Sequence, residues 1–142
     1  MIQERWAPPP RLRLQARIAA PIAAILCALP PARITRILRT LTKKSSPPDA
    51  LEVAEWRNAV NSVSRRCAGN DCLQRSLAVM LLGASKHRAP IWCTGFRVEP
   101  FLAHAWIEVD GDPIGEPAAV REYLKVIEMR PAWKEKEGGD TA

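Results

Sequence analysis

Apolar residues recur every three or four positions through the first half of the chain, which is the spacing of amphipathic helices. This pattern predicts helices over residues 11–29 and 32–43, separated by the helix-breaking pair Pro30-Pro31. A third helix is expected to start near Ser46-Pro47 and to end at Gly69-Asn70. Its buried stripe is expected to consist of Val53, Trp56, Val60, Val63 and Cys67.

The start of a fourth helix is marked more sharply. Asp71 is a residue type that caps helices, and Gln74 three positions later completes a pattern like a capping box. Gly83 is a plausible C-terminal stop. Cys72 is therefore expected to be the first residue of this helix.

After residue 85 the hydrophobic period changes to two, which is the spacing of a β-strand. Residues 91–98, 103–109 and 112–116 are expected to form strands, and Asp110-Gly111 is a strong hairpin signal between the last two. A last helix is expected over residues 117–129. The pattern predicts an α+β fold, in which the helix beginning at Cys72 packs on a small antiparallel sheet.

Charge is distributed unevenly along the chain, whose formal net charge is +6. Residues 1–48 hold nine Lys and Arg residues and one acidic residue, whereas residues 49–142 hold twelve and fourteen. We expect a basic N-terminal arm and helical hairpin (1–48), a core (49–130) and a loose polar tail (131–142). Basic segments can meet nucleic acid, but no nucleic-acid-binding motif is present, so we expect a solvated helix face and no nucleic acid partner.

The four cysteines would suggest disulfides only in a small secreted chain. Residues 18–29 form an apolar stretch that is too short to span a bilayer. The stretch ends in Leu29-Pro30-Pro31 and lacks the small-residue cleavage site of a signal peptide. We therefore expect a cytoplasmic protein with free thiols.

Cys72 differs from the other cysteines because of its place at a helix start. Unpaired backbone N–H groups and the helix dipole favour a thiolate there, and the N–H of Cys72 itself can stabilise an oxyanion. A cysteine nucleophile also needs a base, and a helix end packed on a sheet can meet a strand residue such as His104. The alternative for Cys72 is a small buried residue, and the other histidine, His87, lies in a polar loop.

The register of the predicted hairpin decides whether Glu116 can orient His104. With a two-residue turn, Glu116 points to the face opposite His104. With a three-residue loop and a bulge at Gly111, Trp106 faces Glu116. Glu116 then lies on the same face as His104, with about 7–8 Å between the Cβ atoms of the two residues. A triad that includes Glu116 therefore requires the three-residue loop. Glu116 could otherwise be a first-turn acid of the last helix.

Three motifs resemble the lasso-peptide leader peptidase family in its stand-alone protease version. They are Cys72-Leu73-Gln74-Arg75-Ser76, then Trp92-Cys93-Thr94-Gly95, then His104-Ala105-Trp106-Ile107-Glu108-Val109-Asp110-Gly111 followed by Ile114-Gly115-Glu116-Pro117. The resemblance extends from about residue 11 to about residue 130 and is strongest over residues 65–117.

This resemblance implies a transglutaminase-like, papain-related fold and a cysteine protease that removes the leader from a lasso-peptide precursor. An ATP-dependent cyclase then closes the ring. Cys72 would be the nucleophile, His104 the general base and acid, and Glu116 the orienting group, where the family usually has Asp. Gln74 and Trp106 are candidate substrate contacts. No segment resembles a leader-binding module, so a separate leader-recognition protein is an expected partner, and neither a cofactor nor a metal is expected.

Three other functions are alternatives. The same residues support acyl transfer to an amine, as in transglutaminases. Whether water or an amine accepts the acyl group depends on how open the site is. Cys67, Cys72, Cys93 and His104 are alternative ligands of a structural zinc ion, although no C-x2-C knuckle is present. The basic hairpin could also bind a membrane surface, but its prolines interrupt a continuous interfacial helix.

Overall fold

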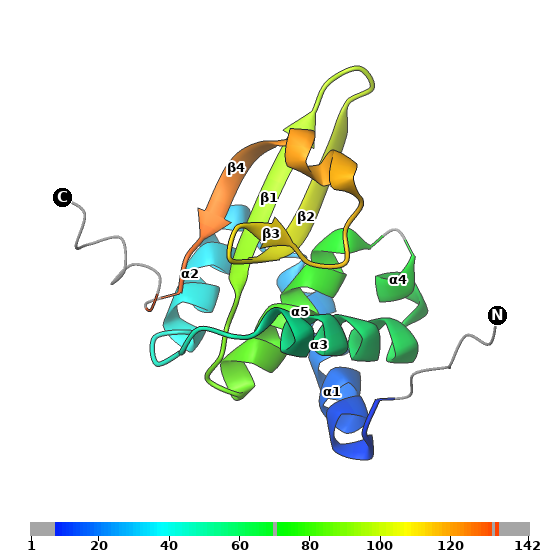
Figure 1. The fold of residues 1–142 in the computed structure, drawn as a ribbon, viewed down its shortest axis with the longest axis vertical. Helices are drawn as coiled ribbons and strands as arrows, with labels where there is room; N and C mark the ends of the chain where they lie inside the picture. The colour runs from blue at the N-terminus through cyan, green and yellow to red at the C-terminus, as the bar shows by residue number, and fades with distance from the viewer. Residues whose placement is uncertain (1–7, 70, 132, 134–142) are drawn as a thin grey trace.

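The computed structural model describes residues 8–69, 71–131 and 133, which include a four-stranded antiparallel sheet. Its strands have the order β3-β2-β1-β4 (Figure 1). They are β1 (Ile91–Arg97), β2 (Leu102–Val109), β3 (Asp112–Pro113) and β4 (Leu124–Met129). The predicted strands 91–98 and 103–109 are thus confirmed to within a residue, whereas β3 is much shorter than the predicted 112–116.

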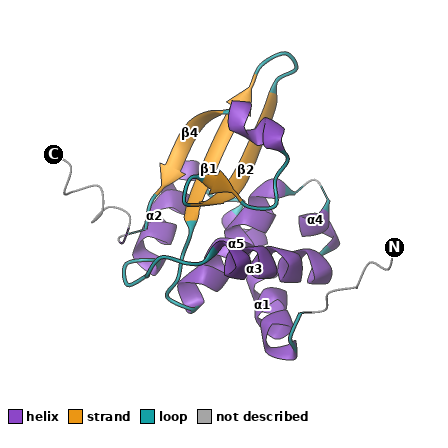
Figure 2. Cartoon of the chain, in the orientation of Figure 1, coloured by secondary structure: helices purple, strands orange, loops and turns teal. Residues whose placement is uncertain are grey.

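Within the part of the chain that the structure describes, the five α-helices precede the strands, and Figure 2 shows both kinds of element in one fold, so the predicted α+β fold is confirmed. None of the helices within the described ranges combines the length and the apolar character that crossing a bilayer requires. The helices are α1 (Pro10–Leu26), α2 (Pro31–Leu41), α3 (Ala50–Val63), α4 (Arg65–Ala68), α5 (Cys72–Ser85) and the 3-10 helix η1 (Ala118–Glu122).

Helix α5 forms the centre of the main core. It packs against α1 and α3 and also against β2, and most of its side chains are buried. One hydrophobic cluster joins the helices to one face of the sheet through residues such as Leu38, Val60, Leu77 and Ile107. The basic N-terminal hairpin therefore shares its core with the rest of the chain, since α1 packs on α5 and α2 contacts both α5 and β4.

The opposite face of the sheet carries a second, smaller cluster. Cys93 and Trp106 are buried there beneath Val120 of η1 and Tyr123. Side chains alternate along a strand, so His104 shares this face of β2 with Trp106. The second cluster therefore supports the strand segment that carries His104.

The predicted last helix over residues 117–129 is wrong. Only η1 is helical in this region, and the chain then forms β4, which pairs antiparallel with β1. The apolar spacing fits a helix locally, but pairing with the free edge of β1 satisfies backbone groups of both strands. Val126 and Ile127 are β-branched, which also favours a strand.

Of the two hairpin registers that the sequence left open, the structure has the two-residue turn and not the three-residue loop. Val109 pairs with Asp112, so the turn contains only two residues. Asp110 and Gly111 have φ values of 52° and 81°. Positive φ at both central residues is the conformation of a type I′ turn, which matches the twist of the two strands.

Two helix boundaries also differ from the prediction. The third helix begins at Ala50 and ends at Val63, because Ser64 adopts extended backbone and caps the short helix α4, which contains Cys67. Helix α5 runs on to Ser85, two residues past the expected stop at Gly83. Of the expected N-terminal arm and C-terminal tail, residues 1–7, 132 and 134–142 lie outside the described ranges.

Candidate active site

Cys72 is the first residue of α5, as the sequence predicts. The first N–H groups of a helix have no intrahelical acceptor and favour negative charge nearby. Asp71 occupies the N-cap position, but its side chain forms no cap hydrogen bond, so the predicted capping box is absent. At the start of α5, beside Cys72, the backbone N–H groups therefore have no hydrogen bond from a capping side chain.

The free edge of β2 supplies a backbone donor to the same sulfur. Ile114 donates its N–H to the carbonyl oxygen of Ile107, so the backbone of Ile107 points toward β3. Backbone groups alternate between the two sides of a strand, so Ala105 points the same way. Because β3 is too short to pair with Ala105, its N–H is left for Cys72, and this donor lowers the pKa of the thiol.

These neighbours favour ionisation of Cys72. Burial raises the pKa of the thiol, but hydrogen bonds from the His104 imidazole and the Ala105 N–H more than offset this effect. The charges of His104 and Arg75 lower the pKa further. The pKa of Cys72 is therefore below the ordinary thiol value.

His104 lies between Cys72 and Glu116. Its Nε2 atom is 3.0 Å from Oε2 of Glu116, whose side chain is only 5% exposed. Hydrogen bonds to Cys72 and Glu116 raise the pKa of His104 to about 9, although burial opposes the shift. His104 and Cys72 thus favour each other's charged forms, the imidazolium and the thiolate.

Aromatic rings hold the imidazole of His104 from two directions. The Trp106 ring stacks on it with a centroid distance of 5.9 Å and an interplanar angle of 16°. The Tyr123 ring lies 5.8 Å away at an angle of 54°. These contacts restrict rotation of the imidazole and so help to define the side that faces Cys72.

Glu116 reaches His104 through a turn of the chain at Gly115, and not through the ladder between β2 and β3. In the two-residue register, continuation of the ladder would place Glu116 opposite Ala105, on the wrong face. The ladder instead ends after Ile114, because Gly115 has a φ of +70°. A positive φ turns the chain sharply, and it returns Glu116 to the face of His104. The predicted need for a three-residue loop is therefore wrong, although the two side chains do meet.

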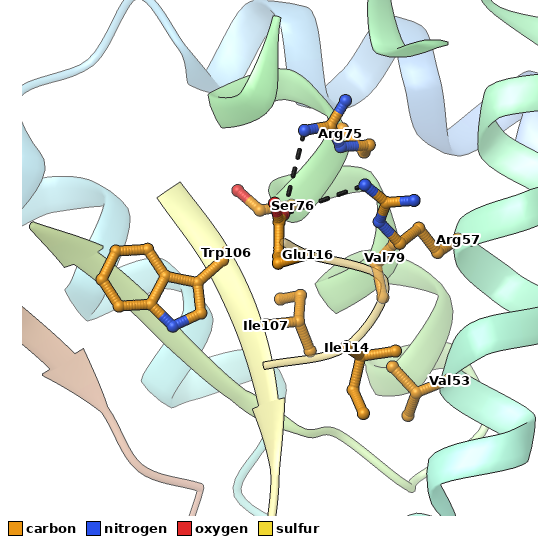
Figure 3. Close-up of a pocket in the computed structure, with 9 residues that line it drawn as sticks. All are labelled: Val53, Arg57, Arg75, Ser76, Val79, Trp106, Ile107, Ile114 and Glu116. Carbon is orange, nitrogen blue, oxygen red and sulfur yellow. Dashed lines mark ion pairs between the residues drawn. The ribbon is translucent and has the colours of Figure 1, made fainter. Parts of the chain in front are cut away.

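Two arginines from different helices approach the carboxylate of Glu116 (Figure 3). Arg57 of α3 has a guanidinium nitrogen 3.8 Å from Oε1, and Arg75 of α5 has one at 3.9 Å. Arg75 also donates hydrogen bonds to the carbonyl oxygens of Cys67, at 2.7 Å, and Gly69, at 3.3 Å. Arg75 therefore joins Glu116 to the chain segment that precedes α5.

An open groove of about 560 Å³ contains both Cys72 and His104. Its walls come from the α1–α2 junction, α5, β1, β2 and β4. Most of its lining is apolar, including Leu29, Ile34 and Val126. A peptide that occupied this groove would have its backbone within reach of the sulfur.

Gln74 and Trp106, the two candidate substrate contacts, both lie outside the lining of this groove. Gln74 is 6% exposed, and its amide nitrogen donates to the carbonyl oxygen of Ala20 in α1 at 2.9 Å. Trp106 is 2% exposed, and its Nε1 atom donates to Glu108 at 2.8 Å. The structure thus places Gln74 between two helices and Trp106 behind His104.

The four residues of the zinc alternative do not come together. Cys67 and Cys93 are buried, and burial raises the pKa of both thiols. Within the described ranges, the one group of three possible metal ligands with close atoms contains Cys93, Glu108 and Glu128. Lys125 already neutralises those carboxylates at 2.9 and 3.2 Å, so this cluster is an ion-pair network.

Sequence reasoning did not identify Arg57 and Arg75 at the site. The position of Arg75 at the site could have been predicted, because a residue three positions after Cys72 lies on the same side of the helix. No sequence pattern predicts Arg57 at the site, since it lies on another helix and reaches Glu116 only through the packing of α3 beside α5. The apolar groove could not be predicted from the sequence either, because its walls come from segments that are far apart in the chain.

Comparisons with known proteins identify a family and one similar protein. The family model for the Transglutaminase-like superfamily matches residues 16–129. The chain is also similar to the microcin J25-processing protein McjB of Escherichia coli, with 34% identity over 58 residues. That match covers 41% of this chain and 28% of McjB. No solved structure matches the chain significantly. From the family match over most of its length, we conclude that the chain belongs to the transglutaminase-like superfamily.

Proposed function

We propose that this protein is a cysteine peptidase that removes the leader from a lasso-peptide precursor. The observation that carries the proposal is the placement of Cys72 at the start of α5, in one groove with a His104 that lowers its pKa and that Glu116 holds at 3.0 Å. The similarity to a protein named for processing microcin J25 supports a peptide substrate. The motif resemblance to lasso-peptide leader peptidases supports the leader as the segment removed.

In the proposed reaction, the Cys72 thiolate attacks the carbonyl carbon of the scissile amide and forms a tetrahedral intermediate. The His104 imidazolium then donates its proton to the leaving amine, and the C–N bond breaks. This leaves a thioester between Cys72 and the leader. His104, now neutral, removes a proton from water, which attacks the thioester and releases the leader carboxylate.

The oxyanion of the tetrahedral intermediate needs donors that are already in place. The N–H of Cys72 fits this role, because the first N–H groups of α5 have no intrahelical acceptor. Gln74 does not fit it, since its amide is hydrogen-bonded to Ala20. We therefore assign one oxyanion donor to the backbone of Cys72.

A separate leader-recognition protein and the ATP-dependent lasso cyclase are the proposed protein partners. The basic residues of the N-terminal hairpin fit an acidic partner surface. Arg33, Arg36 and Arg39 of α2 are all exposed and therefore available for such contacts.

The proposal is tested by incubating the purified protein with a lasso precursor and its recognition protein, followed by intact mass measurement of the products. We expect a leader with a free C-terminal carboxylate and a core peptide with a free amine. Cys72→Ala should abolish cleavage while retaining the wild-type melting temperature and far-UV circular dichroism. Undiminished cleavage by this variant would refute the assignment, and a new amide in place of the carboxylate would indicate acyl transfer.

A further inference from the structure

The groove beside Cys72 is built from parts of the chain that are far apart in the sequence. Leu29 and Ile34 come from the α1–α2 region, Phe101 from the loop between β1 and β2, and Val126 from β4. The N-terminal hairpin therefore contributes a wall of the same groove that holds the candidate nucleophile. Figure 1 shows α2 close to β4, with which it is in contact.

Large apolar side chains are exposed along this groove. Phe101 is 68% exposed and Val126 is 63% exposed. Phe101 also stacks on Phe96, another lining residue, with a centroid distance of 6.0 Å. Clustered apolar side chains that face water often mark a binding site, since covering them is favourable.

Polar side chains are few in the groove. Apart from Cys72 and His104, the polar lining residues are Thr94 and Cys27. No charged residue other than His104 belongs to the lining within the described ranges. A charged or amide side chain placed there would lose water without gaining a partner, whereas an apolar one would not.

We propose that this groove binds a bulky apolar side chain of the substrate, next to the amide that Cys72 attacks. The inference rests on the proposed function: Cys72 lines the groove, so a molecule bound there is the substrate if Cys72 is the nucleophile. Val126 and Phe101 determine specificity by contact with that side chain. The α1–α2 junction closes the groove on the other side through Leu29 and Ile34.

The test uses two reagents of equal shape and charge that alkylate cysteine. N-(3-methylbutyl)iodoacetamide carries an apolar branched end, and N-(2-carbamoylethyl)iodoacetamide carries a polar amide in its place. Alkylation of Cys72 is followed by peptide mapping, which separates it from the half-buried Cys27. Each rate is divided by the rate of the same reagent with N-acetylcysteine. We expect the apolar reagent to react about tenfold faster, since two methyl groups leave water.

Two substitutions should remove this preference. Val126→Asp and Phe101→Asp place a charge in the groove, and both positions are exposed enough to accept one without unfolding. We expect the rate ratio to fall to about threefold or less in either variant. Leu124→Asp and Val98→Asp are matched controls, because these residues are 62% and 66% exposed but do not line the groove. Both controls should keep the wild-type ratio.

The same measurement separates the two proposals. If Cys72 reacts with plain iodoacetamide faster than N-acetylcysteine at neutral pH, but the two matched reagents react equally, the groove inference is wrong and the proposed function stands. Equal ratios in Val126→Asp and Leu124→Asp would also overturn the assignment of Val126. If Cys72 reacts no faster than N-acetylcysteine with any reagent, the proposed function fails, and the groove inference fails with it.

Discussion

The Nε2 atom of His104 lies 3.0 Å from the Oε2 atom of Glu116, and this contact occupies one of the two ring nitrogens. Nδ1 is then the nitrogen left to face Cys72, which hydrogen-bonds to the imidazole. A carboxylate on one side and a thiolate on the other both stabilise the protonated ring. The pair can therefore deliver a proton to a leaving amine at neutral pH, where an ordinary imidazole would be mostly uncharged.

Glu116→Gln should shift the alkaline limb of the pH–activity profile to lower pH. The hydrogen bond and the charge of Glu116 both raise the pKa of His104, which is about 9 in the intact protein. The imidazolium is lost as the pH rises through this pKa, so a lower pKa means loss of activity at lower pH. We expect at least about a tenfold loss near pH 8. The measurement is kcat/KM for precursor cleavage from about pH 5 to 10, and an unshifted alkaline limb would contradict the role of Glu116.

Arg57→Gln should lower kcat without changing KM, because Arg57 faces Glu116 and does not line the groove. It removes a positive charge from a carboxylate that is 5% exposed, and we expect about a two- to fivefold decrease in kcat. Arg57→Lys should retain most of the activity, since its charge is preserved. Equal losses in the two variants would show that the charge of Arg57 is not what supports Glu116.

Gly115→Ala should disrupt the site more than it disrupts the fold. Gly115 has a φ of +70°, and an added Cβ would lie 2.7 Å from Cδ of Arg57. We expect a stability loss of about 1–3 kcal/mol by urea denaturation and a much larger proportional loss of cleavage. Gly111→Ala is the matched control, since Gly111 has a φ of +81° but no atom within 4 Å of an added Cβ. Full cleavage by Gly115→Ala would mean that this turn does not place Glu116.

Gln74→Ala should affect stability and spare catalysis. Its amide donates to the carbonyl oxygen of Ala20 at 2.9 Å in a buried contact between α5 and α1. Loss of this bond removes the side-chain donor that joins α5 to the middle of α1, at a cost of about 0.5–1.5 kcal/mol by urea denaturation. The kcat/KM of the folded variant should stay within about threefold of the wild-type value. A large fall in kcat/KM with unchanged stability would instead support Gln74 as a substrate contact.

Much of the fold could be predicted from local patterns. The helix start at Cys72 and the strand that carries His104 follow from apolar spacing and from residue types that favour particular backbone conformations. Strand β4 could not be identified in this way, because its apolar spacing fits a helix as well. Its conformation depends on pairing with β1, which lies about 30 residues earlier in the chain.

The candidate site was predictable only in part, for a related reason. Cys72 and His104 belong to regular elements, so pattern and chemistry together identify them. The approach of Glu116 depends on one positive φ at Gly115, which breaks the regular ladder that sequence reasoning extended. Arg57 and the walls of the groove come from the packing of distant segments, and no local pattern encodes them.

The most direct measurement of the central claim is the intact mass of the protein after rapid acid quenching of a single turnover with precursor and recognition protein. A thioester on Cys72 predicts a mass increase equal to the leader fragment minus one water, mapped to the peptide that contains Cys72 and absent in Cys72→Ala. Cleavage that proceeds in both proteins with no such adduct would contradict nucleophilic catalysis by Cys72.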